Sequence, residues 1–170
     1  MNIEELIYTY SDYLYRVAFI YTKDERAAEE VVQDVFFNFY RKRDQYNGTA
    51  SLKTYLTKMT INRSYDYLRS WKRAKWVFSE RFKESTEGTE AKYIRCEERG
   101  EITRAVLTLP VKYREVLLLY YYEDFSVKEI AVFLNSPEST IKTRLQRARE
   151  KLKQVLPRQK WEVLANDDAR

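Results

Sequence analysis

Apolar positions recur at intervals of three and four residues along most of the chain, which is the pattern of amphipathic helices. In the first half, three such segments follow one another, with apolar positions over residues 3–21, 28–39 and 52–68. Thr22 and Glu25 have the spacing of a capping box for the second helix, and Ser51 is the expected N-cap of the third. The pattern therefore predicts a helical N-terminal domain over residues 1–75, with a loop at 44–50.

Residues 76–100 have only weak periodicity, and their polar centre contains Gly88. They are interpreted as a flexible linker that could contain short helical patches. The alternative is one helix that continues into the next domain, but Gly88 and its polar neighbours would interrupt the apolar stripe of such a helix. Beyond the linker, helical segments are expected over residues 102–107, 110–120, 126–134 and 136–155. These form a second domain over residues 101–157, and residues 158–170 remain as a C-terminal tail.

The last two of these helices have well-marked boundaries. Ser126 with Glu129 forms a capping-box signature at the start of the first one. Asn135 suits the turn that follows, because asparagine tolerates the left-handed backbone conformation. Ser136 is then expected as the next N-cap, with Pro137 at the first helical position. Two helices joined by so short a turn predict a helix-turn-helix.

The final helix has the two faces that a recognition helix requires. Its apolar seam consists of Ile141, Leu145, Ala148, Leu152 and Val155. On the other side, Lys142, Thr143, Gln146 and Arg147 are placed for base edges in the major groove, with Ser139 and Thr140 before them. Arg144 and Arg149 are expected to contact the DNA backbone. The alternative is an ordinary basic surface helix.

Charge is unevenly distributed within a modest net charge of +5. Residues 41–75 hold ten Lys or Arg against two acids, and residues 138–160 hold eight against two. Residues 24–34 have the opposite bias, with five acids against one arginine. Basic stripes favour nucleic acid as a partner, and the separate acidic helix favours a protein partner. Solvated helix faces would give the same counts.

Composition excludes several classes of function. The chain has no histidine and only one cysteine, Cys96, so neither a metal site nor an internal disulfide is expected. It has no glycine-rich phosphate loop or nucleophile elbow, and no catalytic site or cofactor is predicted. No apolar run reaches the roughly 18 residues of a membrane span, and the acidic N-terminus is unlike a signal peptide. A cytoplasmic protein without direct membrane insertion is predicted.

With these patterns in place, the chain resembles the extracytoplasmic-function (ECF) group of sigma-70 family RNA polymerase sigma factors. Residues 1–75 resemble sigma region two, and residues 101–156 resemble sigma region four. The resemblance is carried by residues 28–36, 47–56, 61–69, 126–131 and 140–149, which occur in the order and spacing of the family. It implies an all-α fold of two small helical domains and a role in promoter-specific transcription initiation during a stress or envelope response.

The resemblance also implies roles for individual residues. Contacts with core RNA polymerase, through its β′ clamp, fall to Glu30, Gln33, Asp34, Phe37 and Asn38. Capture of the minus-ten DNA strand falls to Tyr46, Asn47, Gly48, Thr49, Ser51, Lys53, Asn62, Arg63, Tyr65 and Arg69. In that group Asn62 would face a base flipped out of the duplex, whereas Tyr65 is equally compatible with stacking on bases and with a place in the core.

Recognition of the minus-thirty-five duplex would fall to Ser139, Thr140, Lys142, Thr143, Arg144, Gln146, Arg147 and Arg149. The polymerase β flap and an anti-sigma factor, often anchored in the membrane, are the further partners that the family implies. No small-molecule substrate is expected.

Four positions depart from the usual family pattern. Tyr55 replaces a tryptophan, an exchange expected to preserve aromatic packing. Glu30 and Asp34 reverse the commoner order of Asp and Glu, which alters their reach by one methylene. Asn135 replaces the usual glycine of the turn. The main rival hypothesis is an ordinary helix-turn-helix regulator with an N-terminal sensor or dimerisation domain, which would not explain the acidic helix followed by the basic one.

Overall fold

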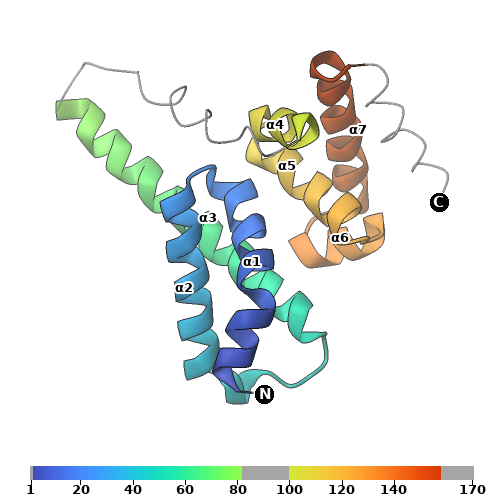
Figure 1. Ribbon diagram of the computed structural model, residues 1–170. Helices are drawn as coiled ribbons and strands as arrows, with labels where there is room; N and C mark the ends of the chain where they lie inside the picture. Colours follow the sequence, from blue (N-terminus) through green and yellow to red (C-terminus); the bar gives the residue numbers. More distant parts are fainter. Residues whose placement is uncertain (1, 82–99, 158–170) are drawn as a thin grey trace. The chain divides into compact units, whose positions relative to one another are not determined.

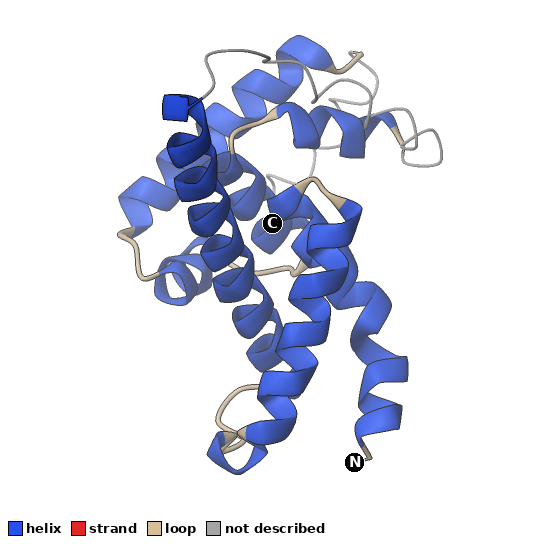
Figure 2. Ribbon diagram, turned by 90° about the vertical axis from the view of Figure 1, so that its left-hand side faces the viewer, coloured by secondary structure: helices blue, strands red, loops and turns tan. Residues whose placement is uncertain are grey.

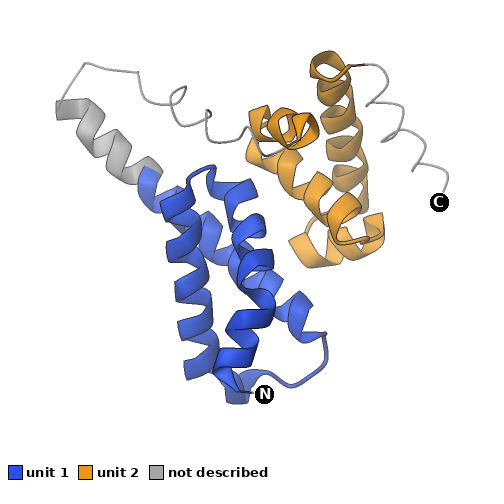
Figure 3. Ribbon diagram, in the orientation of Figure 1, with its two compact units in different colours: residues 1–84 blue, residues 85–170 orange. Residues whose placement is uncertain are grey.

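The chain folds into two compact helical units, divided between residues 84 and 85 (Figure 3). The structure is a computed structural model that describes residues 2–81 and 100–157, with side chains described over 2–71 and 100–157. Every regular element in these ranges is a helix (Figure 2). The predicted all-α fold with two domains is confirmed. Most of the predicted linker and the whole of the predicted tail, residues 158–170, lie outside the described residues.

The first unit consists of three long helices, α1 (Ile3–Thr22), α2 (Glu25–Arg41) and α3 (Leu52–Arg81), with a short 3-10 turn η1 (Arg43–Gln45) after α2 (Figure 1). Their apolar stripes meet in one core, which includes Leu14, Val17, Ala28, Leu56 and Ile61. The helix α3 continues to Arg81, past Lys75 where the first domain was predicted to end.

The predicted capping box of α2 is wrong, whereas the predicted cap of α3 is confirmed. Lys23 adopts the left-handed conformation (φ 58°) and ends α1, so Thr22 still belongs to α1, and its hydroxyl donates to the Ala18 carbonyl oxygen at 3.0 Å. Asp24 therefore becomes the N-cap of α2, and its carboxylate accepts the Ala27 N–H at 3.1 Å. The Ser51 hydroxyl oxygen accepts the Thr54 N–H at 3.1 Å, one residue before α3 begins.

The second unit consists of α4 (Glu101–Thr108), α5 (Val111–Leu117), the π-helical turn η3 (Leu118–Tyr122), α6 (Val127–Leu134) and α7 (Glu138–Val155). Four of the five predicted seam residues of α7 are buried, namely Ile141, Leu145, Ala148 and Leu152. The fifth, Val155, is 56% exposed. The chain leaves the helix at Leu156, which adopts an extended conformation and is buried in place of Val155.

The helix-turn-helix is formed by α6 and α7. The capping box of α6 is confirmed: the Ser126 hydroxyl oxygen accepts the Glu129 N–H at 3.2 Å, and the Glu129 carboxylate accepts the Ser126 N–H at 2.8 Å. The Ser126 hydroxyl also donates to the Glu129 carboxylate at 2.7 Å. This bond, followed by the one from the Ser126 backbone N–H, lowers the pKa of the Glu129 carboxyl because both stabilise its charged form. The left-handed conformation of Asn135 (φ 49°) is also confirmed.

The predicted N-cap of α7 is displaced by one residue. Pro137, rather than Ser136, occupies the N-cap position, and α7 begins at Glu138. The Ser136 hydroxyl instead donates to the Leu134 carbonyl oxygen at 3.3 Å. Because proline at the N-cap has no side-chain hydrogen bond to offer, no side chain caps α7.

Candidate functional site

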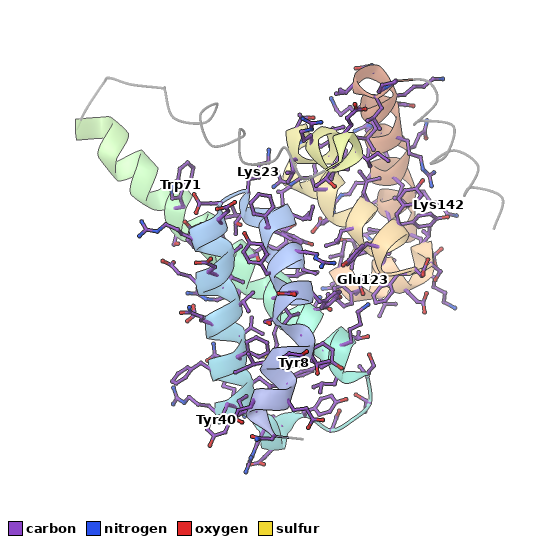
Figure 4. The ribbon with its side chains drawn as sticks, viewed as in Figure 1. Tyr8, Lys23, Tyr40, Trp71, Glu123 and Lys142 are labelled. Carbon is purple, nitrogen blue, oxygen red and sulfur yellow. The ribbon has the colours of Figure 1, made fainter. Side chains whose placement is uncertain are left out.

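Two of the predicted polymerase-binding residues line an apolar groove between α1 and α2. The groove has a volume of about 640 Å³, and it is lined by Gln33 and Phe37 of α2 together with Ile7 and Tyr15 of α1. Phe37 is 59% exposed, and Tyr40 extends the same surface at the end of α2 (Figure 4). An exposed aromatic cluster of this kind is typical of a protein interface.

The contribution of α1 to this groove was not predicted from the sequence. Ile7 is one of the apolar positions of the predicted helix 3–21, yet it is 42% exposed. The signal was present, because Ile3, Leu6, Ile7 and Tyr10 make a stripe wider than a single helix contact covers. Of the other predicted residues on α2, Glu30 is exposed and Asn38 is half-buried.

Asp34 and Arg63, which were assigned to different partners, form an ion pair with each other. The Arg63 Nε atom donates to Asp34 Oδ2 at 2.6 Å, and its Nη2 atom lies 2.5 Å from the same oxygen. The pair joins the acidic helix α2 to the basic helix α3, and neither residue's sequence context indicated it. The polymerase-binding and DNA-binding candidates of this unit are therefore in direct contact.

The predicted minus-ten loop is folded by its own hydrogen bonds. The Tyr46 hydroxyl donates to the Ala50 carbonyl oxygen at 2.6 Å. The Asn47 side-chain oxygen accepts both the backbone N–H and the hydroxyl of Thr49, at 3.1 and 2.8 Å. Gly48 has φ 73°, a conformation that favours glycine. The loop is thus preformed, and the amide oxygen of Asn47 is already engaged.

An aromatic cluster anchors this loop to the helices. The Tyr46 ring centroid lies 5.1 Å from that of Tyr55 and 6.4 Å from that of Phe39. Tyr55 occupies the position where the family usually has tryptophan, and its ring is also 6.1 Å from Phe39. Tyr55 therefore makes aromatic contacts on two sides in this chain.

The predicted DNA-binding residues of α3 differ in their surroundings. Asn62 is exposed on the outer face of the helix. The Lys53 Nζ atom lies 4.5 Å above the Tyr13 ring, and Arg69 pairs with Asp66 on the same helix at 2.5 Å. Tyr65 packs edge-on against the buried Tyr21, with ring centroids 5.4 Å apart, which favours the interpretation of Tyr65 as part of the core.

In α7, the predicted minus-thirty-five residues divide between two faces. Lys142, Thr143, Gln146 and Arg147 are all exposed. Figure 4 shows Lys142 on the outer face of α7. Ser139 and Thr140 lie in the first turn of the same helix. The outer face therefore presents amide, hydroxyl and cationic groups side by side, which is the chemistry that recognises base edges.

The two remaining arginines of α7 contact the second unit itself. The Arg144 Nη1 atom bonds Glu115 Oε1 of α5 at 3.1 Å, and the Glu115 side chain is only 3% exposed. The Arg149 Nε atom donates to the Tyr121 hydroxyl at 3.0 Å. Both arginines therefore have partners within the second unit. Their assignment to the DNA backbone stays a prediction. Glu115 was missed, although a carboxylate next to the apolar run 116–119 is a signal of a buried pair.

A basic residue of α5 also adjoins the outer face of α7. Lys112 lines an open groove of about 310 Å³ with Thr140, Thr143 and Arg147. Lys112 was not among the predicted DNA-binding residues, because it precedes the helix-turn-helix by more than ten residues.

Within the described residues, no three His, Cys, Asp or Glu side chains gather as a metal site would need. A search of the same residues finds no helix that combines the length and the apolar character of a membrane span.

Comparison with known proteins places both units. Residues 6–74 match the family model described as sigma-70 region 2, and residues 99–152 match the model described as sigma-70, region 4. The ECF RNA polymerase sigma factor SigW of Bacillus subtilis is 28% identical over 165 residues, covering 89% of this chain and 87% of SigW. SigM of the same organism is 28% identical over 159 residues, covering 93% of this chain and 97% of SigM.

Two solved structures share the fold. One is the sigma factor RpoE in complex with the anti-sigma factor NepR from Bartonella quintana, with a TM-score of 0.70 and 24% identity, covering 89% of this chain and 94% of RpoE. The other is CnrH in complex with the cytosolic domain of CnrY, with a TM-score of 0.58 and 21% identity, covering 89% of this chain and 84% of CnrH. Both helical units match sigma-70 regions in the order two then four, and ECF factors match over most of the length, so this chain belongs to the ECF group of the sigma-70 family of RNA polymerase sigma factors.

Proposed function

We propose that this protein binds core RNA polymerase and directs promoter-specific initiation, with the two units contacting different parts of the promoter. The observation that carries the proposal is the presence, in one chain, of a helix-turn-helix and of a separate unit that has both a preformed polar loop and, on α3, an exposed amide, Asn62. A regulator that only binds duplex DNA would not need the second arrangement.

In the second unit, α7 would lie in the major groove of the minus-thirty-five element. Its outer face offers Lys142, Gln146 and Arg147, whose donors match purine edges. Arg144 supports this face from behind, because its bond to the buried Glu115 fixes α7 on α5. Lys112, at the side of the same face, would contact a phosphate.

In the first unit, the loop 46–51 and α3 would hold the melted minus-ten strand. The bonds within the loop fix its shape before DNA binds, so little conformational entropy is lost on binding. Asn62 would pair with the Watson–Crick edge of a flipped base, and the remaining basic side chains of α3 would contact phosphates.

The groove between α1 and α2 would bind polymerase. Phe37 and Gln33 combine an exposed apolar ring with an amide, and Glu30 lies exposed on the same helix. We assign the β′ clamp to this surface and the β flap to the second unit. We further propose that the protein acts in the cytoplasm in a stress or envelope response, that an anti-sigma factor restrains it, and that all catalysis is performed by the polymerase.

Run-off transcription tests the proposal directly. Purified core polymerase is combined with the full chain on a set of candidate promoters, with core alone as the control. We expect transcripts only when the chain is present, and only from a subset of promoters. Tight, sequence-specific binding of duplex DNA by the free chain, with no effect on core polymerase, would favour an ordinary helix-turn-helix regulator instead.

A further inference from the structure

The ion pair between Asp34 of α2 and Arg63 of α3 joins two surfaces that the proposed function assigns to different partners. Both side chains are partly exposed, at 41% for Asp34 and 40% for Arg63. Both contacts from the guanidinium go to a single carboxylate oxygen, Oδ2. Solvent and ligands can therefore reach the pair. The two contacts involve only one oxygen of the Asp34 carboxylate and two of the three nitrogens of the Arg63 guanidinium.

The guanidinium of Arg63 keeps free hydrogen-bonding capacity in this arrangement. An arginine has five N–H donors in one rigid plane. The Nε–H and one Nη2–H point to Asp34, which leaves the two donors of Nη1 and the second donor of Nη2. Such an edge matches the geometry of a phosphate. Arg63 can thus bind a phosphate while Asp34 continues to hold it.

Arg63 is also the direct neighbour of the exposed Asn62 on α3. A phosphate bound at Arg63 would fix the strand whose base reaches Asn62. Because phosphate contacts set the register of a nucleic acid on a protein, the orientation of Arg63 would affect the whole minus-ten contact.

We propose that Asp34 is a positioning residue for promoter binding: its carboxylate orients Arg63 so that the free edge of the guanidinium receives a phosphate of the minus-ten strand. The inference rests on the proposed function and adds to it, because Asp34 lies on the helix that was assigned to polymerase. Asp34 acts here through Arg63 and makes no contact with DNA itself.

The direction in which DNA affinity changes when Asp34 loses its charge shows whether Asp34 positions Arg63 or has no role in DNA binding. A carboxylate near a phosphate repels it, so removing the charge of an acid with no positioning role would strengthen DNA binding. If Asp34 orients Arg63, Asp34→Asn weakens binding instead. We expect a loss of roughly three- to tenfold, up to that of Arg63→Ala, as for other phosphate contacts.

The experiment measures binding of a single-stranded minus-ten oligonucleotide to holoenzyme by fluorescence anisotropy over a range of salt concentrations. Each variant is first titrated with core polymerase, and the DNA measurement is made where core saturates it. The variants are Asp34→Asn, Arg63→Ala, the double substitution, and Asp34→Glu. Glu25→Gln is the matched control, because it removes an equal charge from the exposed first turn of the same helix.

We expect Asp34→Asn to weaken binding only when Arg63 is present, so that it adds nothing to Arg63→Ala. The slope of log affinity against log salt should fall by about 0.7 in Arg63→Ala, the value for one phosphate on a single strand. Asp34→Glu should bind within about twofold of wild type, because it restores the charge with a slightly longer reach, and Glu25→Gln should leave affinity unchanged.

Equal or tighter DNA binding by Asp34→Asn would overturn the inference, as would an equal loss with and without Arg63. Weaker core binding by Asp34→Asn with normal DNA binding at saturation would overturn it while leaving the proposed function intact. Failure of the wild-type chain to bind core polymerase at all would overturn the proposed function and the inference together.

Discussion

The two units arrange their candidate DNA-binding residues in different ways. In the second unit, the two faces of α7 have different roles. Lys142 and Arg147 are exposed on the outer face, where DNA could bind, whereas Arg144 points inward to the buried Glu115. In the first unit, the candidate residues are bonded to one another across elements, as in the pair of Asp34 with Arg63.

This difference determines how far each site depends on the rest of its unit. The outer face of α7 needs only a helix held at the right angle, so single substitutions on it should leave the fold unchanged. The site in the first unit depends on contacts between α2, α3 and the loop, so substitutions there should affect more than one function.

Substituting the inward-facing arginine of α7 should destabilise the second unit. Arg144→Ala removes the guanidinium that bonds the Glu115 carboxylate, which is 3% exposed. Breaking a buried pair costs about 3–5 kcal/mol, and because the Arg144 side chain is 29% exposed we expect about 2–3 kcal/mol. The outward-facing Arg147→Ala should change stability by about 0.5 kcal/mol or less. Hydrogen exchange of α7 amides in the full chain measures both, and equal protection in the two variants would contradict the division by face.

Truncating the aromatic side chain of the α1–α2 groove should weaken core polymerase binding without unfolding the first unit. Phe37→Ala removes an exposed ring, so we expect at least a roughly tenfold loss of affinity, as for an interface anchor. Tyr8→Ala is the matched control, because Tyr8 is an exposed aromatic of α1 that does not line the groove (Figure 4). Equal losses in both variants, measured by titration with core polymerase, would mean that the groove is not the contact surface.

The helix-turn-helix cap should make a smaller contribution. Ser126→Ala removes the hydroxyl that caps α6, and we expect a loss of about 1 kcal/mol in the free energy of unfolding at neutral pH. The folded pKa of Glu129 is lowered by its bonds from Ser126, so its contribution to stability is present above its usual pKa and is lost as pH falls through the lowered value. The difference between wild type and Ser126→Ala should therefore shrink in acid. A difference that stays constant as Glu129 titrates would exclude this coupling.

The helices could be predicted from the sequence because each one buries a single periodic stripe. The cap of α6 and the turn at Asn135 were predictable for a related reason, since they depend on residues close together in the chain. The start of α2 was predicted wrongly because Lys23 adopts a left-handed conformation that no local pattern indicates. Contacts between distant residues, such as Asp34 with Arg63 and Glu115 with Arg144, depend on helix packing, and this explains why the sequence did not reveal them.

The proposed function depends on the first unit capturing a melted strand while the second recognises duplex DNA. It is tested most directly by run-off transcription with Asn62→Ala and Arg147→Ala on two templates, one fully duplex and one already unpaired over the minus-ten segment. On the duplex template, Asn62→Ala should lose roughly ten- to hundredfold in yield, since an amide paired with a base contributes about 1–3 kcal/mol. The unpaired template should rescue it in part, because the cost of unstacking disappears while the lost base contact remains. Arg147→Ala should be impaired equally on both templates, and identical behaviour of the two variants across the templates would contradict the assignment of separate roles.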